Sequence, residues 1–97
     1  MEFDGFDWDK GNRDKCQRHG VSIGEIERLF DRTVLVGPDV AHSSEERRFR
    51  AIGATPTGRR VFLVFTWRTK DGRRFLRPIS ARYMHRKEVA AHEKDIP

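Results

Sequence analysis

The spacing of apolar residues predicts a strand and a helix at the start of the chain. Aromatic residues separated by acids over residues 3–8 indicate a short first strand. Asp9 is suited to cap a helix that runs to about Arg18. Gly20 then supplies the residue at which such a helix stops.

A second helix is expected to begin at Ser22. Glu25 completes a capping box with this serine, and apolar residues recur on one helical face: Ile23, Ile26, Leu29 and Phe30. Residues 33–36 predict a brief strand, and residues 40–44, which lack any period, predict a loop.

Beyond Arg47 the apolar spacing changes to that of strands. Three strands are expected, over residues 48–55, 61–69 and 73–81. The run over residues 61–65 is apolar on both faces, as is typical of a central strand that is covered on each side. A weakly amphipathic helix over residues 84–93 follows. The expected fold is α+β, an antiparallel β-sheet meander with two N-terminal helices and one C-terminal helix.

Length and composition limit the class of protein. The length of 97 residues suffices for one domain and not for two, so residues 1–97 are expected to form a single domain. The single cysteine, Cys16, cannot form an internal disulfide, and the acidic first residues do not resemble a secretory signal, so a cytoplasmic protein is expected. The longest apolar run has five residues, against roughly 20 for a bilayer span, so no membrane association is expected.

Positive charge is concentrated in one part of the chain. Residues 47–86 contain twelve Arg or Lys and one acid, a net charge of +11, while the remainder has a net charge of −6. Such a basic region attracts polyanions, which makes nucleic acid the expected partner or substrate. The alternative is a solvated, strand-rich surface that happens to use arginine.

Motifs for cofactors are absent from the sequence. No pair of His, Cys or carboxylate residues has the spacing of metal ligands, and the glycines do not form a Walker loop or a dinucleotide fingerprint. We therefore expect no metal and no cofactor.

Two places carry candidate chemistry. His19 follows the first expected helix, and an imidazole changes its charge near neutral pH, which suits proton transfer; the alternative is a histidine that only caps the helix. The second place is residues 65–68 facing residues 79–82, if the Asp71-Gly72 turn closes a regular hairpin. Alternation then gives a face with two guanidinium groups and two hydroxyls, which suits phosphate: Thr66, Arg68, Ser80 and Arg82. Arginines at strand ends that are merely solvated are the alternative.

Several short motifs resemble one known family, the BrnT toxins, over nearly the whole chain. The motifs, in chain order, are Phe6-Asp7-Trp8-Asp9, His19-Gly20-Val21-Ser22, Phe30-Asp31, Glu46-Arg47-Arg48, Ala51-Ile52-Gly53, Val64-Phe65-Thr66 and Ile79-Ser80-Ala81-Arg82. The resemblance implies a RelE-like fold, a ribonuclease that arrests growth, and a BrnA-like ribbon-helix-helix antitoxin as partner. It also implies that the protein contacts DNA only indirectly, through the antitoxin complex.

The resemblance further implies catalytic residues by motif: His19, Arg68, Ser80 and Arg82. The resemblance implies a lysine in the first helix, four residues after the tryptophan and eight before the histidine. In this chain Asn12 follows Trp8 by four residues and precedes His19 by seven. Lys10 or Lys15 can take its place only if the helix turns one of them inward.

The hypothesis at this stage is metal-independent cleavage of RNA through attack by its 2′-hydroxyl. His19 transfers a proton, and Arg68 and Arg82 hold the phosphate. Ser80 and Thr66 are lesser donors, and Trp67 or Tyr83 is available for base stacking. Two other classes are open: a non-enzymatic basic module that binds nucleic acid or a partner, and a structural subunit of a larger assembly.

Overall fold

The computed structural model describes residues 1–42 and 46–92. In this part of the chain there are three α-helices and five strands. The strands are β1 (Gly5–Phe6), β2 (Leu35–Pro38), β3 (Phe49–Ala54), β4 (Arg60–Lys70) and β5 (Arg73–Tyr83). The helices are α1 (Lys10–Gln17), α2 (Ile23–Arg28) and α3 (Arg86–His92). Short 3-10 turns cover Leu29–Asp31 and Val40–His42.

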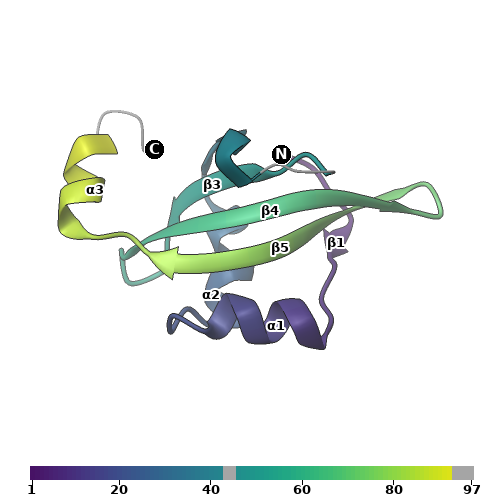
Figure 1. Ribbon diagram of the computed structural model, residues 1–97, viewed down its shortest axis with the longest axis horizontal. Coiled ribbons are helices and arrows are strands. Elements are labelled where there is room, and N and C mark those ends of the chain that lie inside the picture. Colours follow the sequence, from purple (N-terminus) through teal and green to yellow (C-terminus); the bar gives the residue numbers. More distant parts are fainter. Residues whose placement is uncertain (43–45, 93–97) are drawn as a thin grey trace.

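The strands form one sheet in the order β1-β5-β4-β3-β2 (Figure 1). β2 to β5 pair antiparallel in sequence order, and β4 lies in the middle, as its two apolar faces predict. The expectation of a wholly antiparallel sheet is wrong, because β1 pairs parallel to β5. The N–H groups of Asp4 and Asp7 donate to the carbonyls of Arg74 and Leu76 and so extend this pairing. The α+β class is confirmed, with a mixed sheet.

The starts of α1 and α2 lie where the sequence predicts them. The Asp9 side chain accepts from the Asn12 N–H at 3.0 Å, while the Asn12 side chain accepts from the Asp9 N–H at 2.7 Å. Ser22 and Glu25 form the same reciprocal box at the start of α2. Gly20 has φ +93°, which favours glycine at the stop after α1. These local signals fix both helices because each cap satisfies backbone donors that the helix itself leaves unpaired.

Other boundaries differ from expectation. The strand expected over residues 33–36 is observed two residues later, as β2. The expected loop over residues 40–44 begins with the turn at Val40–His42, and its last two residues lie outside the described part. The final helix starts at Arg86 rather than at residue 84, and its expected last residue, 93, also lies outside the description.

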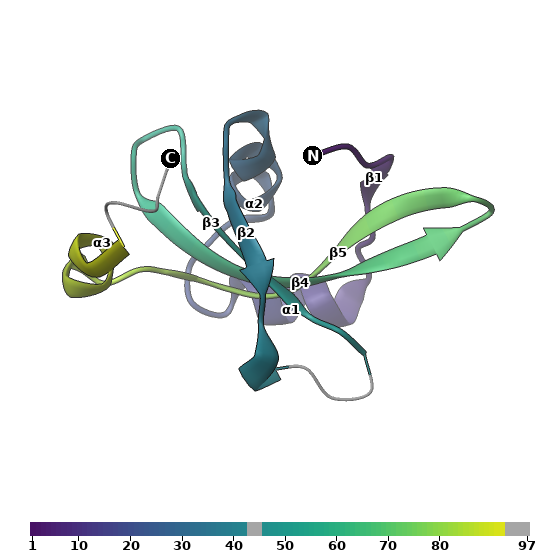
Figure 2. The same ribbon diagram turned by 90° about the horizontal axis from the view of Figure 1, so that it is seen from above.

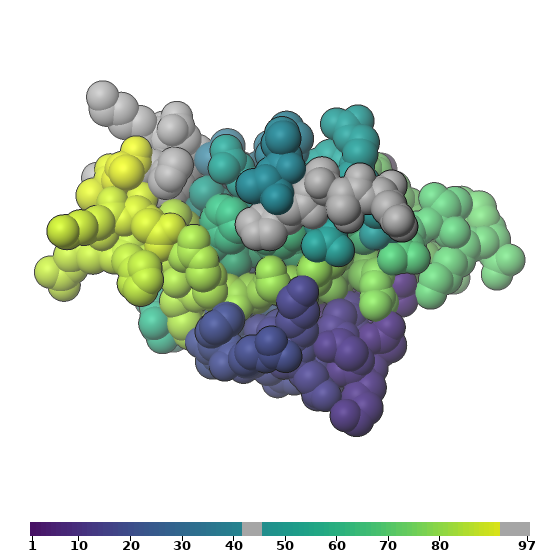
Figure 3. Space-filling model, in the orientation of Figure 1, coloured from purple at the N-terminus to yellow at the C-terminus, as the bar shows by residue number. Residues whose placement is uncertain are grey.

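One face of the sheet packs against α1 and α2. Its core joins Cys16 of α1 and Ile26 of α2 to Leu63 and Phe65 of β4, all with no exposed surface. Figures 1 and 2 show α2 behind the sheet and α1 beneath β5. Side chains that alternate with the core residues lie on the other side of β4 and β5, which we call the open face. Figure 3 shows this side of the molecule, with α1 along its lower edge.

Candidate functional site

Three of the predicted site residues line one cavity on the open face. His19 approaches from the chain after α1, and Ser80 and Arg82 come from β5. The cavity has a volume of about 200 Å³ and is completed by Phe62, Val64 and Ala81. Segments from the two ends of the chain therefore meet at this cavity.

A β-bulge in β5 turns Ser80 and Arg82 toward the open face. Pro78 pairs with Phe65, but Ser80 pairs with Val64, so Ile79 is an extra residue in β5. If β5 instead alternated regularly through Ile79, starting from Pro78, which lies opposite the core residue Phe65, Ser80 and Arg82 would fall on the core side. Bulges of this kind re-aim side chains, and here Ile79 and Ser80 both reach cavities on the open face.

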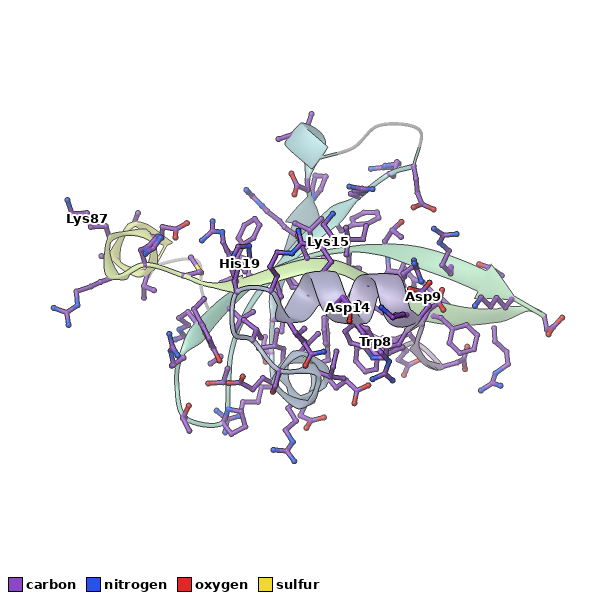
Figure 4. All side chains as sticks on the ribbon, turned by 60° about the horizontal axis from the view of Figure 1, so that its bottom comes forward. Trp8, Asp9, Asp14, Lys15, His19 and Lys87 are labelled. Atoms are coloured by element: carbon purple, nitrogen blue, oxygen red, sulfur yellow. The ribbon has the colours of Figure 1, made fainter. Side chains whose placement is uncertain are left out.

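His19 is held at the cavity by the turn that ends α1. The Gly20 N–H donates to the Gln17 carbonyl at 3.0 Å, and Arg18 is the C-cap of the helix. His19 itself is exposed. In Figure 4 His19 and Lys15 lie on the same side of α1, while Trp8 lies on the other side.

Arg82 is paired with a carboxylate from the last helix. Its two terminal nitrogens donate to Glu88 Oε1 at 2.7 Å and Oε2 at 2.9 Å, and its guanidinium lies 4.9 Å from the centre of the Phe62 ring. The hydrogen bonds from Arg82 and from the His85 N–H lower the pKa of Glu88 from 4.5 to about 2. The same pairing raises the pKa of Arg82. The start of α3 is thereby fastened to the rim of the cavity.

The expected juxtaposition of residues 65–68 with residues 79–82 is wrong. The Asp71-Gly72 turn pairs Lys70 with Arg73, so residues 65–68 lie opposite residues 75–78. Arg68 faces Phe75 across the strands, and Arg82 faces Phe62 at the other end of the hairpin. The two arginines thus belong to different parts of the open face.

Arg68 lines a second cavity, of about 280 Å³, between α1 and the open face. Lys15 enters this cavity from α1, so of the two lysines considered it is Lys15 that turns inward. Arg68 lies 3.3 Å from Glu46, and both side chains are partly exposed. Lys10 pairs with Asp14 at 3.1 Å and is 92% exposed, on the outside of α1.

The remaining sequence candidates do not line either cavity. Thr66 is 2% exposed, and its hydroxyl donates to the Arg47 carbonyl at 2.8 Å. Trp67 packs against the core beside Phe65, with the guanidinium of Arg74 over its ring at 3.6 Å. These two side chains are engaged in holding the fold.

Tyr83 also packs on the core side. Its hydroxyl donates to Glu25 Oε1 at 2.7 Å, which raises the pKa of Tyr83 and lowers that of Glu25. The Arg59 guanidinium lies 3.4 Å from the centre of its ring. Its hydroxyl therefore links β5 to α2, away from the open face.

Asn12, which stands where the family resemblance implies a lysine, has a structural role here. Asn12 is 6% exposed, and its side-chain N–H groups donate to the carbonyls of Asp7 and Pro78, each at 2.9 Å. This amide fixes α1 against β5 directly beside the bulge. A lysine could not reproduce the acceptor that caps α1.

Two residues near the cavities were missed by sequence reasoning. Glu88 lies six residues from Arg82, across a strand-to-helix junction for which no local pairing rule exists. Arg77 also lines the second cavity and pairs with Asp7 at 3.5 Å and Asp9 at 2.8 Å. Its place opposite Thr66 follows from the hairpin register, which the two-residue turn already implies.

Neither a cluster of metal ligands nor a membrane-spanning helix occurs in the part of the chain that the structure describes. No group of three or more His, Cys, Asp or Glu side chains within residues 1–42 and 46–92 is arranged to hold a metal ion. None of the helices in this range is both long enough and apolar enough to cross a membrane. Burial raises the pKa of the Cys16 thiol to about 11, so this core cysteine is a poor nucleophile.

Comparison with known proteins identifies the family. A family model described as ribonuclease toxin, BrnT, of type II toxin-antitoxin system matches residues 8–88. This match covers His19, both strands of the hairpin and Glu88. No curated protein matches the chain. The chain therefore belongs to the BrnT family of ribonuclease toxins of type II toxin-antitoxin systems.

Proposed function

We propose that this toxin cuts RNA at the cavity lined by His19, Ser80 and Arg82, without a metal. The observation that carries the proposal is the convergence of an imidazole, a hydroxyl and a guanidinium on one cavity, from segments far apart in the sequence. These are the groups that phosphodiester cleavage requires: a proton carrier, a hydrogen-bond donor and a cation.

In the proposed reaction the RNA 2′-hydroxyl attacks the adjacent phosphorus. His19 accepts the hydroxyl proton, the bond from phosphorus to the 5′-oxygen breaks, and that oxygen takes a proton from water. The products are a 2′,3′-cyclic phosphate and a 5′-hydroxyl. Arg82 holds two phosphate oxygens through its planar fork, and Ser80 donates a further hydrogen bond.

We also propose a biological setting, which membership of the family supports. We expect cleavage to inhibit translation and growth in the cytoplasm, and a BrnA-like ribbon-helix-helix antitoxin to neutralise the toxin. We also expect a RelE-like chain fold, and DNA contact only through the antitoxin. The basic open face supports this setting, because its positive charge attracts the phosphates of RNA and can equally attract an acidic segment of the antitoxin.

Substitution in the cavity tests the assignment. His19→Ala and Arg82→Ala are each expected to lower the cleavage rate by on the order of 10²–10³ and to relieve growth arrest. Arg73→Ala, at the exposed start of β5, is the matched control for loss of one arginine. Unchanged thermal melts exclude unfolding as the cause. Full toxicity of both cavity variants would refute the proposal.

Substrate chemistry gives a second test. Replacing the 2′-hydroxyl at the cut position with hydrogen is expected to abolish cleavage, and a chelator is expected to have no effect. Equal cutting of DNA, or loss of activity with the chelator, contradicts the route. Growth arrest without new RNA ends would instead favour the non-enzymatic binding module.

A further inference from the structure

The second cavity is distinct from the one that we assign to cleavage. It lies between α1 and the part of the hairpin that includes Arg68, and it shares no lining residue with the cavity of His19. We propose that it binds a backbone phosphate of the same RNA strand, away from the bond that is cut. This inference rests on the proposed function, since it assigns a further part of the same substrate.

The lining of this cavity suits an anion. Four of its side chains are cationic, Lys15, Arg48, Arg68 and Arg77, and only Glu46 is acidic. Arg77 is engaged by two aspartates. Lys15 forms no ion pair with any residue in the part of the chain that the structure describes, and Arg68 has a partly exposed partner, Glu46, at 3.3 Å. Lys15 and Arg68 are therefore the two cations best placed to receive a phosphate.

Adjacent residues of β5 connect the two cavities. Ile79 lines the second cavity, and Ser80, the next residue, lines the first. The bulge brings both side chains to the open face, so a strand of RNA can pass from one cavity to the other without crossing the sheet.

The distance between the cationic residues indicates the length of RNA involved. Arg82 pairs opposite Phe62, and Arg68 lies six residues further along β4. At about 3.3 Å per residue these positions are roughly 20 Å apart. A stacked strand advances about 3.4 Å per nucleotide, so the second phosphate belongs to a nucleotide several positions from the cut.

Binding of a non-cleavable strand tests the proposal. The probe is a short 2′-O-methyl RNA, and the measurement is its dissociation constant over a range of salt concentrations. Lys15→Ala and Arg68→Ala are each expected to weaken binding about tenfold. Each is also expected to reduce the slope of log affinity against log salt by about 0.7, the value for one phosphate contact with a single strand.

Arg13→Ala is the control for a general loss of charge. Arg13 lies on the same helix as Lys15, but its guanidinium lies over the Trp8 ring at 5.7 Å, on the other side of α1. This variant is expected to keep the salt slope of the original protein. If Arg13→Ala and Lys15→Ala change affinity equally, long-range charge explains the effect and the proposal is overturned.

A series of trimmed RNAs separates this proposal from the cleavage mechanism. For the original protein, KM is expected to fall once the RNA is long enough to reach the second cavity, with kcat unchanged. Lys15→Ala and Arg68→Ala are expected to remove this step in KM. If the step persists while His19→Ala abolishes cleavage, the second site is refuted and the mechanism stands. If these variants alter only antitoxin affinity, the cavity holds an acidic peptide and the proposal also fails.

Discussion

Arg82 and Glu88 form a bidentate ion pair, with hydrogen bonds of 2.7 and 2.9 Å, that joins β5 to α3 at the rim of the His19 cavity. A phosphate offers the same pair of oxygens to the same guanidinium fork. Under the proposed function, Glu88 and the RNA phosphate therefore compete for Arg82. The Arg82 and Glu88 side chains are 40% and 31% exposed, so water screens their attraction. A phosphate can therefore replace Glu88 on the Arg82 guanidinium.

Glu88→Gln is expected to strengthen binding of non-cleavable RNA. The substitution removes the competing charge but keeps an oxygen that can accept from the His85 N–H at the start of α3. An exposed ion pair contributes up to about 1 kcal/mol, which corresponds to an affinity gain of up to about fivefold. Asp14→Asn, an equal charge change on the outside of α1, is expected to have a smaller effect. Weaker binding by Glu88→Gln would show that Glu88 positions Arg82 rather than competing with RNA.

The titration of Glu88 gives a prediction about pH. Its pKa falls from 4.5 to about 2 because the folded protein stabilises the charged carboxylate. The pairing is therefore fully present above pH 4.5 and is lost as the pH falls toward 2. Carboxyl NMR shifts of Glu88 measure this midpoint directly. In Arg82→Ala the midpoint is expected to move up toward 4.5, and an unchanged midpoint would contradict the assigned cause.

Tyr83→Phe is expected to affect stability and not RNA binding. The Tyr83 hydroxyl donates to Glu25 at 2.7 Å on the core side of the sheet, away from both cavities. Loss of this hydrogen bond should lower the free energy of unfolding by about 1 kcal/mol and Tm by about 4–8 °C. A melt and a titration with 2′-O-methyl RNA measure the two effects. A loss of RNA affinity with an unchanged melt would restore Tyr83 as a base-stacking residue.

Gly53→Ala is expected to destabilise the fold. A Cβ at Gly53 would lie 2.9 Å from Val34 Cγ1 and 3.4 Å from Leu29 Cδ2, in a packed region. Overpacking of this kind costs about 1–3 kcal/mol. Gly37→Ala is the matched control, since a Cβ on that β2 residue meets no atom within 4 Å. Denaturant unfolding compares the two variants, and equal stabilities would mean that the contacts around Gly53 relax at little cost.

The sequence predicts those features whose causes are local. The caps formed by Asp9 with Asn12 and by Ser22 with Glu25 lie within four consecutive residues, so the helix starts can be predicted without any knowledge of the fold. The apolar run in β4 likewise identifies the central strand. His19, Ser80 and Arg82 were identified as candidates by motif, and the structure brings them to one cavity.

The features that were missed depend on contacts between distant residues. The parallel pairing of β1 with β5 joins Gly5 to Phe75, and no spacing rule anticipates it. The bulge at Ile79 is marked only by the preceding Pro78, and a proline within a strand is found at an edge or at a bulge, so it does not by itself identify the bulge. The register of the hairpin, by contrast, was available from the two-residue turn, which sets residue 65 opposite residue 78. Counting residues outward from this turn places Arg68 opposite Phe75, so the sequence already implies that Arg68 and Arg82 lie at different ends of the hairpin.

The extra residue in β5 makes this strand tolerant of one particular deletion. Removing Ile79 would let the hairpin pair without interruption, with Ser80 still opposite Val64 and Arg82 still opposite Phe62. Both side chains would keep their side of the sheet, and only the contribution of Ile79 to the second cavity would be lost. Loss of this one codon should thus leave the toxin's proposed cleavage residues in place.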